Sequence, residues 1–271
     1  MGSGVIFEYY LDRWGLTPEG EPIITHSSRL LPVRYQGKPA MLKIAMVEEE
    51  RQGNLLMVWW NGVGAAQVLA QEDDALLMER AVGSASLIQK IHEGQDEEAS
   101  RIICEVVAKL HTSRVGSYPP FELHSLARWF KVLEAAAVKY GGVLIQAAAT
   151  AYQLLSEPQE VVILHGDIHH GNILDFGAHG WLAIDPKGII GERTFDYANI
   201  FCNPDLEIAT QPGRLVKQLN IISETANLNR LRLLKWILAY AGLSAAWILE
   251  ESEKPELAIA VAKLAMTELT K

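Results

Sequence analysis

The chain has 271 residues, of which 49% are apolar, and a formal net charge of -9. A chain of this length and composition can bury a substantial core, either as one large domain or as two lobes. The negative charge argues against nucleic acid as a partner, because proteins that bind phosphate backbones usually gather Lys and Arg on one face. A small cationic partner suits the charge better.

Several features predict a cytoplasmic protein without a membrane anchor. The beginning, Met1-Gly2-Ser3-Gly4, lacks the basic flank and the small-residue cleavage site of a signal peptide. The apolar stretch 237–249 is too short to span a bilayer. Cys104 and Cys202 do not have the spacing of a metal or redox pair, so we expect both to be packed as free thiols. Nothing in the sequence points to an obligate protein partner.

The first third of the chain is predicted to be rich in strands. Gln36-Gly37-Lys38 is a plausible hairpin turn between two apolar segments, and Pro32 places the first of these segments at a sheet edge or a bulge. A helix is expected from about Glu48 until Asn61-Gly62 ends it. The expected strands are 29–35, 39–46 and 75–78.

After residue 81 the pattern changes to helices. Residues 97–111 carry an apolar stripe at helical spacing, with Asp96 as a suitable cap. Another helix is expected at about 145–155, before a strand at 161–164. Residues 228–249 are apolar nearly all round, which predicts a buried helix.

These elements predict an α+β fold in two parts. A small, β-rich region, residues 1–80, precedes a larger and mainly helical region, residues 81–271, and the two join near Glu79 to Gly83.

Residues 165–172, HGDIHHGN, precede a predicted hairpin formed by residues 173–184. Antiparallel pairing returns the chain to its starting end, so the backbones of Asn172 and Asp185 are expected within roughly 5 Å of each other. An amide oxygen beside a carboxylate makes a suitable site for Mg²⁺. Asp167 lies on the same loop and is placed to accept a proton from a hydroxyl that attacks a metal-bound phosphate.

The order Asp, four residues, Asn, hairpin, Asp is that of the protein kinases. Residues 160–205 resemble the aminoglycoside phosphotransferase family, whose signature HGDxxxxN begins here at His165 and is followed by Ile184-Asp185-Pro186. The resemblance implies a bilobal, protein-kinase-like fold that uses ATP and Mg²⁺. It implies these roles: catalytic base, Asp167; magnesium ligands, Asn172 and Asp185.

Residues upstream agree with this resemblance. Lys43 lies on the second predicted strand, as the kinase lysine that reaches the nucleotide phosphates does. Its expected partner is Glu50, with Glu49 as the alternative. Residues 76–81 resemble the kinase hinge, and the backbone between Glu79 and Ala81 is expected to bind adenine.

The phosphate-covering loop departs from the kinase pattern, because no G-x-G-x-x-G precedes Lys43. Thr25-His26-Ser27-Ser28 takes its place. The hydroxyls and backbone amides of Ser27 and Ser28 are expected to cover the phosphates instead.

The run GIIGERTFDYANIFCNPD at 188–205 and LSAAW at 243–247 resemble the aminoglycoside/hydroxyurea resistance kinases, and specifically the streptomycin 6-phosphotransferases. The resemblance implies transfer of a phosphoryl group to a hydroxyl of an aminoglycoside, streptomycin above all, whose guanidinium groups suit the acidic chain. Glu192 and Asp196 are then candidate ligands of the acceptor. Asp196 is equally compatible with a bracing role in the catalytic loop.

Other interpretations stay open. The acceptor of such a kinase could be hydroxyurea or a small metabolite instead. A metallophosphoesterase is another class, but it needs a second metal and further ligands, and no D-x-H pair occurs upstream. Histidines at 165, 169 and 170 are expected to hold the loop by hydrogen bonds rather than to bind zinc. Trp236, Tyr240 and Trp247 share a helix face, where core packing is favoured over contact with the substrate.

Overall fold

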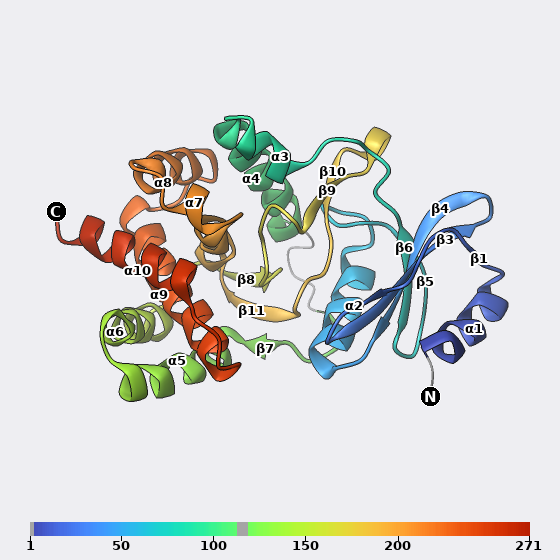
Figure 1. Cartoon of the computed structure of the whole chain (residues 1–271), viewed down its shortest axis with the longest axis horizontal. Coiled ribbons are helices and arrows are strands. Elements are labelled where there is room, and N and C mark those ends of the chain that lie inside the picture. Colours follow the sequence, from blue (N-terminus) through green and yellow to red (C-terminus); the bar gives the residue numbers. More distant parts are fainter. Residues whose placement is uncertain (1–2, 113–118) are drawn as a thin grey trace.

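The computed structural model describes residues 3–112 and 119–271, so the first two residues of the chain lie outside it. Figure 1 shows a lobe built around a β-sheet at one end and a larger, mostly helical lobe at the other, joined by the segment that follows β6. The smaller lobe consists of α1 (Ser3–Trp14), β1 (Thr17–Pro18), β2 (Ile23–Ile24), β3 (Ser28–Tyr35), β4 (Lys38–Ala45), α2 (Glu48–Trp60), β5 (Val68–Glu72) and β6 (Ala75–Glu79).

The sheet of the smaller lobe is antiparallel, in the order β1-β3-β4-β6-β5, with β2 also paired to β3. Strands β3 and β4 form the predicted hairpin, in which Tyr35 pairs with Lys38. The prediction of an edge position for Pro32 is wrong for β3 as a whole, because β3 has neighbours on both sides. Pro32 itself falls between the stretches that pair with β1 and β2, where its missing N–H costs no ladder hydrogen bond.

Helix α1 covers one face of this sheet, and it is not among the predicted elements. Its buried Phe7 packs in a cluster with Val33, Leu42 and Leu77 from the sheet. The opposite face of the sheet holds Leu76 and Met78, which belong to the same continuous core as α2 and the larger lobe. The apolar residues of α1 recur at helical spacing, a signal that the sequence did contain.

The larger lobe contains α3 (Leu87–His92), α4 (Asp96–Thr112), β7 (His124–Ser125), α5 (Leu126–Tyr140), α6 (Val143–Ser156), β8 (Val161–Leu164), β9 (Ile173–Asp175), η1 (Gly177–His179), β10 (Trp181–Ala183), β11 (Ile189–Glu192), η2 (Arg193–Tyr197), η3 (Asn199–Cys202), α7 (Leu206–Ala209), α8 (Arg214–Thr225), α9 (Arg230–Glu250) and α10 (Glu256–Leu269). Strand β11 lies between β7 and β8, and β9 pairs with β10 as the predicted hairpin. Asp96 is the first residue of α4 rather than its cap, and its carboxylate pairs with Arg214 instead.

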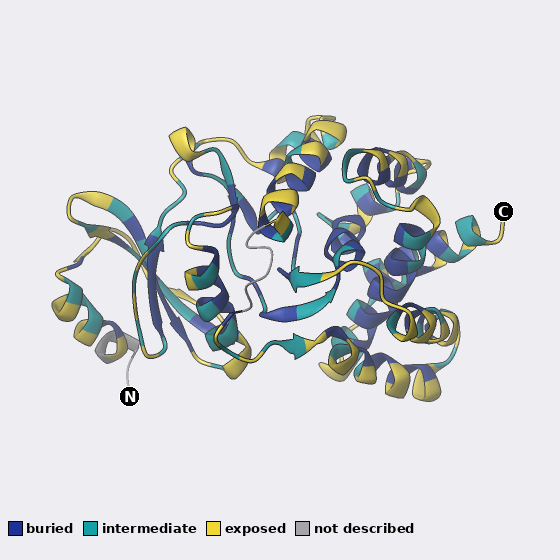
Figure 2. Ribbon diagram, turned by 180° about the vertical axis from the view of Figure 1, so that it is seen from behind, coloured by how far each residue is buried: buried dark blue, intermediate teal, exposed yellow. Residues whose placement is uncertain are grey.

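Helix α9 is the central helix of this lobe and packs against α5, α6 and α10. Its 21 residues are long and apolar enough to cross a membrane by length and composition alone, but 67% of its apolar window is buried inside the protein. The prediction of a buried helix at 228–249 is therefore confirmed. Figure 2 shows that buried residues of this lobe are concentrated where the helices meet, whereas exposed residues lie on their outer faces. Cys104 and Cys202 are both free and buried, as expected.

The lobes are also joined beside the hinge. The amide of Ala66 donates to the carbonyl of Ala183, and the amide of Ala183 donates to the carbonyl of Gly64, each at 2.9 Å. The indole of Trp60 at the end of α2 stacks on His165 of the larger lobe, with ring centroids 6.1 Å apart. These contacts fix α2 against the hairpin and the catalytic loop. The boundary between residues 80 and 81 stays a prediction, although the sheet does end at Glu79.

A substitution at Gly242 would show how tightly α9 is packed against α6. A Cβ atom at this position would lie 2.4 Å from the Cβ of Ala147 on α6, too close for both to stay in place. We expect Gly242→Ala to lower the free energy of unfolding by about 1–3 kcal/mol through overpacking, although alanine is the better helix former. Urea denaturation measures the change. The double variant Ala147→Gly/Gly242→Ala should regain part of the loss, and no recovery would contradict this account.

Candidate active site

The catalytic loop between β8 and β9 is held by one buried carboxylate. Asp196 in η2 accepts hydrogen bonds from the backbone amides of His165 and Gly166, at 2.9 and 2.8 Å. Nε2 of His111 on α4 lies 2.8 Å from the same carboxylate, and Asp196 is only 1% exposed. Asp196 thus braces the loop, and the expectation that it contacts the acceptor is corrected, because its oxygens are already bonded and face no cavity.

Asp167 is oriented by two amide side chains. Nδ2 of Asn172 donates to one carboxylate oxygen at 3.1 Å, and Nδ2 of Asn199 donates to the other at 3.0 Å. The side chain of Asp167 remains 31% exposed and borders two cavities. Asn199 is a site residue that the sequence did not reveal, because nothing in η3 marks one asparagine as different from its neighbours.

His165 connects the loop to the hairpin. Its Nε2 lies 2.9 Å from the carbonyl oxygen of Ile184, and its Nδ1 accepts a hydrogen bond from the amide of Asp167 at 3.2 Å. Burial lowers the pKa of His165, which favours the neutral imidazole that this pattern requires. Burial also lowers the pKa of His170 to about 3. Across residues 3–112 and 119–271, no three His, Cys, Asp or Glu side chains are grouped to hold a metal ion.

Asn172 and Asp185 meet at the open end of the β9–β10 hairpin, where the amide of Ile184 donates to the carbonyl of Asn172 at 2.9 Å. Both side chains line a cavity of about 240 Å³. Asn172 uses its side-chain nitrogen to reach Asp167, which leaves its amide oxygen as a ligand atom. Asp185 has φ of 63°, a left-handed conformation that is uncommon outside glycine and is found at functional sites. An amide oxygen and a carboxylate on one cavity fit Mg²⁺.

Asp185 also belongs to a cluster of four charged side chains. The other three are Lys43, Glu50 and Lys187. Glu50 forms ion pairs with both Lys43 and Lys187, and Asp185 does the same, at 2.5 Å to Lys43 and 3.1 Å to Lys187. Burial raises the pKa of Asp185, but the two ammonium groups outweigh that effect and hold it below its ordinary value. The expected pairing of Lys43 with Glu50 is present. The role of each residue toward a nucleotide stays a prediction.

The loop that replaces the glycine-rich sequence also contacts Glu50. The hydroxyls of Ser27 and Ser28 donate to the Glu50 carboxylate at 3.3 and 3.0 Å. Both serines line the same cavity as Lys43. The backbone amide of Ser28 is also engaged, because it donates to Oγ1 of Thr25 at 2.9 Å. The expected role of Ser27 and Ser28 in covering phosphates stays a prediction. Glu49 does not replace Glu50 and instead faces a different cavity.

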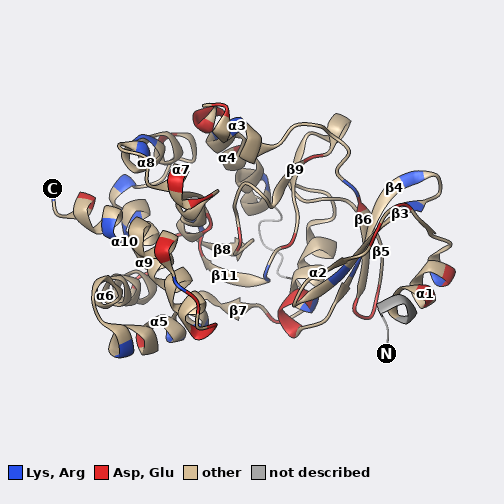
Figure 3. Cartoon of the chain, viewed as in Figure 1, with Lys and Arg blue, Asp and Glu red and all other residues tan. Residues whose placement is uncertain are grey.

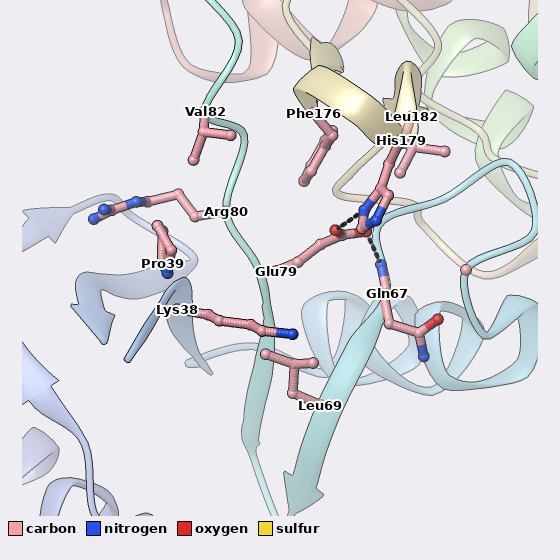
Figure 4. Close-up of a pocket in the computed structure, with 11 residues that line it drawn as sticks. Lys38, Pro39, Gln67, Leu69, Glu79, Arg80, Val82, Phe176, His179 and Leu182 are labelled. Atoms are coloured by element: carbon pink, nitrogen blue, oxygen red, sulfur yellow. Dashed lines mark hydrogen bonds and ion pairs between the residues drawn. The ribbon is translucent and has the colours of Figure 1, made fainter. Parts of the chain in front are cut away.

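The predicted hinge adjoins a cavity of about 600 Å³, which Figure 4 shows. The Glu79 carboxylate points to one side of the hinge, where it accepts a hydrogen bond from the amide of Gln67 and lies 2.7 Å from Nδ1 of His179. These contacts join β5, the hinge and the hairpin turn. Among the described residues, none accepts a hydrogen bond from the amide of Ala81. Adenine binding between Glu79 and Ala81 stays a prediction.

A separate cavity of about 510 Å³ has Asp167 in its wall, and we name it the acceptor cavity. Its walls combine carboxylates, aromatic rings and one ammonium group. Figure 3 shows acidic residues both at the start of α2 and around the end of α9, the two elements that supply the carboxylates. The lining residues are Glu49, Trp129, Gly166, Asp167, Lys187, Tyr240, Trp247, Glu250 and Glu251.

The aromatic residues of α9 pack in the core, and two of them also line this cavity. Tyr240 is 6% exposed and packs against Phe195, so core packing is confirmed for it although it borders the cavity. Trp247 is half-buried at the edge of the core and lines the cavity, where it meets Trp129 edge to face at 5.2 Å. Trp236 is fully buried, and its indole N–H donates to Glu192 at 2.8 Å. For Trp236 the expectation of core packing is confirmed.

Glu192 lies in the interior rather than in the acceptor cavity. It is 1% exposed, it pairs with Arg232 at 2.5 Å, and it also accepts a hydrogen bond from the amide of Gln159 at 3.0 Å. Burial raises the pKa of this carboxyl, but Arg232 and the other donors hold it below its ordinary value. The expectation that Glu192 binds the acceptor is corrected, because its carboxylate joins β11 to α9 and has no free face.

The fold and this arrangement of Lys43, Glu50, Asp167, Asn172 and Asp185 define a protein-kinase-like phosphotransferase. Among solved structures, the chain is similar to a thermostable mutant of aminoglycoside phosphotransferase APH(4)-Ia in ternary complex with ADP and hygromycin B. The TM-score is 0.60 at 13% identity, over 98% of this chain and 96% of that one. The predicted bilobal, protein-kinase-like α+β fold is confirmed.

The chain belongs to the aminoglycoside/hydroxyurea antibiotic resistance kinases, whose family model matches residues 13–252. It is 52% identical over 244 residues to a streptomycin 3''-kinase of Klebsiella pneumoniae, covering 88% of this chain and 91% of that protein. It is 27% identical over 260 residues to a streptomycin 6-kinase of Streptomyces glaucescens, covering 91% and 83%. The predicted family is thus confirmed, and the phosphoesterase alternative falls.

A substitution at Glu192 would measure how much its buried ion pair with Arg232 contributes to the stability of the larger lobe. We expect Glu192→Gln to lower the free energy of unfolding by about 3 kcal/mol at pH 7, because it leaves the largely buried Arg232 without its counter-charge. A carboxylate with a lowered pKa stabilises the fold above its ordinary pKa and loses that effect as the pH falls through the folded value. The difference between wild type and variant should therefore shrink below about pH 4.3.

The matched control is Glu160→Gln. Glu160 pairs with Arg193. The two arginines are about equally exposed, at 19% for Arg193 and 17% for Arg232, but Glu160 is 66% exposed and Glu192 only 1%. Water can replace the Glu160 carboxylate, so its loss should cost less than about 1 kcal/mol. Denaturant unfolding of both variants at pH 7 and at pH 4 measures the two effects. Equal losses in the two variants would show that Glu192 is not the buried brace described above.

Proposed function

We propose that this protein transfers the γ-phosphoryl group of ATP to a hydroxyl of streptomycin and thereby confers resistance to the drug. The observation that carries the proposal is the acceptor cavity, which places carboxylates and aromatic rings next to Asp167. The 52% identity to a streptomycin 3''-kinase supports the same acceptor. Such a role requires only ATP, Mg²⁺ and a small cationic acceptor, and it suits a cytoplasmic protein.

The reaction is a direct in-line transfer. The acceptor hydroxyl oxygen forms a bond to the γ-phosphorus while the bond from that phosphorus to the bridging oxygen of ADP breaks, and the hydroxyl proton passes to Asp167. Asn172 and Asn199 keep the Asp167 carboxylate facing the acceptor. Lys43, held by Glu50, neutralises charge on the nucleotide phosphates. Mg²⁺ held by Asn172 and Asp185 supplies further neutralisation of the phosphates when bound.

The acceptor cavity suits guanidinium groups. Glu49, Glu250 and Glu251 offer carboxylates, which guanidinium binds through paired hydrogen bonds, and Trp129 and Trp247 offer ring faces and edges. Burial raises the pKa of Glu49, and a bound cation would favour its ionised form. A neighbouring cavity of about 250 Å³ shares Asp167 and Tyr240 with this one, so a three-ring acceptor has room on both sides of the base.

We further propose that the 3''-hydroxyl is the one modified. The chain shares 52% identity with the streptomycin 3''-kinase and 27% with the streptomycin 6-kinase. This proposal replaces the 6-position that the sequence resemblance suggested. Both enzymes act on the same drug, so the choice of acceptor does not depend on the choice of hydroxyl.

Purified protein tests both statements. With ATP and Mg²⁺, streptomycin should stimulate ADP release in a coupled assay, whereas hydroxyurea and other aminoglycosides should not. Asp167→Asn should lower kcat by at least about 100-fold, since a positioned general base contributes 10²–10⁴-fold. Phosphorus and proton NMR of the product identify the esterified hydroxyl. Stimulation by hydroxyurea alone, or a product phosphorylated at position 6, would contradict the proposal.

The acidic wall predicts how the drug binds. The double variant Glu250→Gln/Glu251→Gln should raise KM for streptomycin about 10-fold, roughly the worth of one charge-assisted contact, with kcat and KM for ATP nearly unchanged. Glu253→Gln is the matched control, because Glu253 is exposed on the same connection but does not line the cavity. Steady-state kinetics at fixed ionic strength separate the two, and equal KM values would remove these carboxylates from the binding site.

A further inference from the structure

Lys187 is the charged residue of the site that the phosphotransfer scheme above leaves without a role. It follows Asp185 by two positions, and its side chain is 14% exposed. Its ammonium lies 2.8 Å from Oε1 of Glu50 and 3.1 Å from Oδ2 of Asp185. Two carboxylates therefore face the ammonium group, which forms an ion pair with each of them.

Lys187 stands between the two cavities. It lines the acceptor cavity together with Asp167, whereas its partner Asp185 lines the cavity of about 240 Å³ together with Lys43, and we call this second one the nucleotide cavity. A phosphoryl group that moves from the nucleotide to a hydroxyl beside Asp167 must pass from one cavity to the other. Lys43 does not line the acceptor cavity, so its charge lies on the nucleotide side of that path.

The backbone of Lys187 is fixed on the catalytic loop. Its amide donates to the carbonyl of His165 at 2.8 Å. Gly53 on α2 lets the helix approach the carbonyl of Pro186 directly, since a Cβ atom at Gly53 would lie 2.1 Å from that oxygen. A Cβ atom at Gly166 would likewise lie 3.3 Å from the Cβ of Lys187. The long side chain thus starts from a fixed point of the backbone.

We propose that Lys187 is a second catalytic lysine, whose ammonium contacts the phosphoryl group during transfer and stabilises the charge on its equatorial oxygens. Lys187 forms no covalent bond and keeps its proton. The bond changes are those of the in-line transfer above, with the hydroxyl proton going to Asp167. Preorganised donors aimed at developing charge are among the largest contributions to catalysis. This inference rests on the proposed phosphoryl transfer, but not on streptomycin as the acceptor.

A purely structural role makes a different prediction. If Lys187 only neutralised Glu50 and Asp185, its loss would disturb the Lys43 pair and the magnesium ligand, and nucleotide binding would weaken with catalysis. If Lys187 also contacts the phosphoryl group during transfer, its loss should weaken binding of the transition-state mimic much more than binding of the nucleotide. Affinity for a mimic of the transition state separates the two roles.

The experiment measures dissociation constants by titration calorimetry with Mg²⁺, first for ADP and then for ADP with aluminium fluoride, which mimics the phosphoryl group in transfer. The proteins are wild type, Lys187→Met, Lys187→Arg and the matched control Lys263→Met, which removes an exposed lysine of α10. Lys187→Met should bind the mimic about 100-fold more weakly, as for loss of one preorganised donor, while its affinity for ADP changes less than about 3-fold. Lys187→Arg should recover most of the affinity, and Lys263→Met should match wild type.

The outcomes are distinct. Equal weakening of ADP and of the mimic in Lys187→Met would reduce Lys187 to a positioning residue and overturn the proposal, as would unchanged affinity for the mimic. Steady-state kcat in the same variant should fall by about the same factor as the affinity for the mimic. Water serves as the acceptor in the mimic complex. A wild-type protein that binds the mimic but does not phosphorylate streptomycin would therefore contradict the proposed acceptor and leave the result for Lys187 standing.

Discussion

The structure depends on the mutual neutralisation of four buried or half-buried charges. Lys43 and Glu50 come from the smaller lobe, and Asp185 and Lys187 come from the segment after β10. An unpaired charge in such a place is costly, whereas an alternating set of two carboxylates and two ammonium groups satisfies every member. Because each carboxylate reaches both lysines, the cluster fixes how close the lobes approach.

Backbone packing supports the same arrangement. Helix α2 lies directly on the segment that follows Asp185, with Gly53 against the carbonyl of Pro186. The stacking of Trp60 on His165 and the hydrogen bonds between 64–66 and β10 add further contacts on the same side. Helix α2 is therefore packed as part of the site in this structure. Lys43 and Glu50 are already paired in this arrangement.

Carboxylates that the sequence alone does not distinguish take different roles in the folded protein. Asp196 and Glu192 both follow Asp185 in sequence, yet both turn inward, one to amides of the loop and the other to Arg232 and Trp236. The carboxylates that face the acceptor cavity, Glu250 and Glu251, lie at the far end of α9. A buried carboxylate needs several donors, and those donors come from elements that the fold brings together.

The sequence by itself determined the chemistry of the catalytic loop. The order of Asp167, Asn172 and a hairpin before Asp185 is local, because a tight antiparallel hairpin must return the chain to its starting end. The family, the strand that carries Lys43 and the buried character of α9 followed from equally local patterns. Helices α1, α5, α8 and α10 were left unpredicted, although the apolar spacing of α1 was present in the sequence.

Only the tertiary structure decided which residues surround the acceptor and which support the base. Trp129, Lys187, Asn199 and Glu250 follow one another at separations of 58, 12 and 51 residues, and no spacing rule connects them. It also decided that Glu192 and Asp196 are internal braces and that Tyr240 borders a cavity from within the core, whereas Trp236, four residues earlier on the same helix, is fully buried. Periodicity states that two side chains share a helix face. What that face meets depends on long-range packing, which only the folded chain specifies.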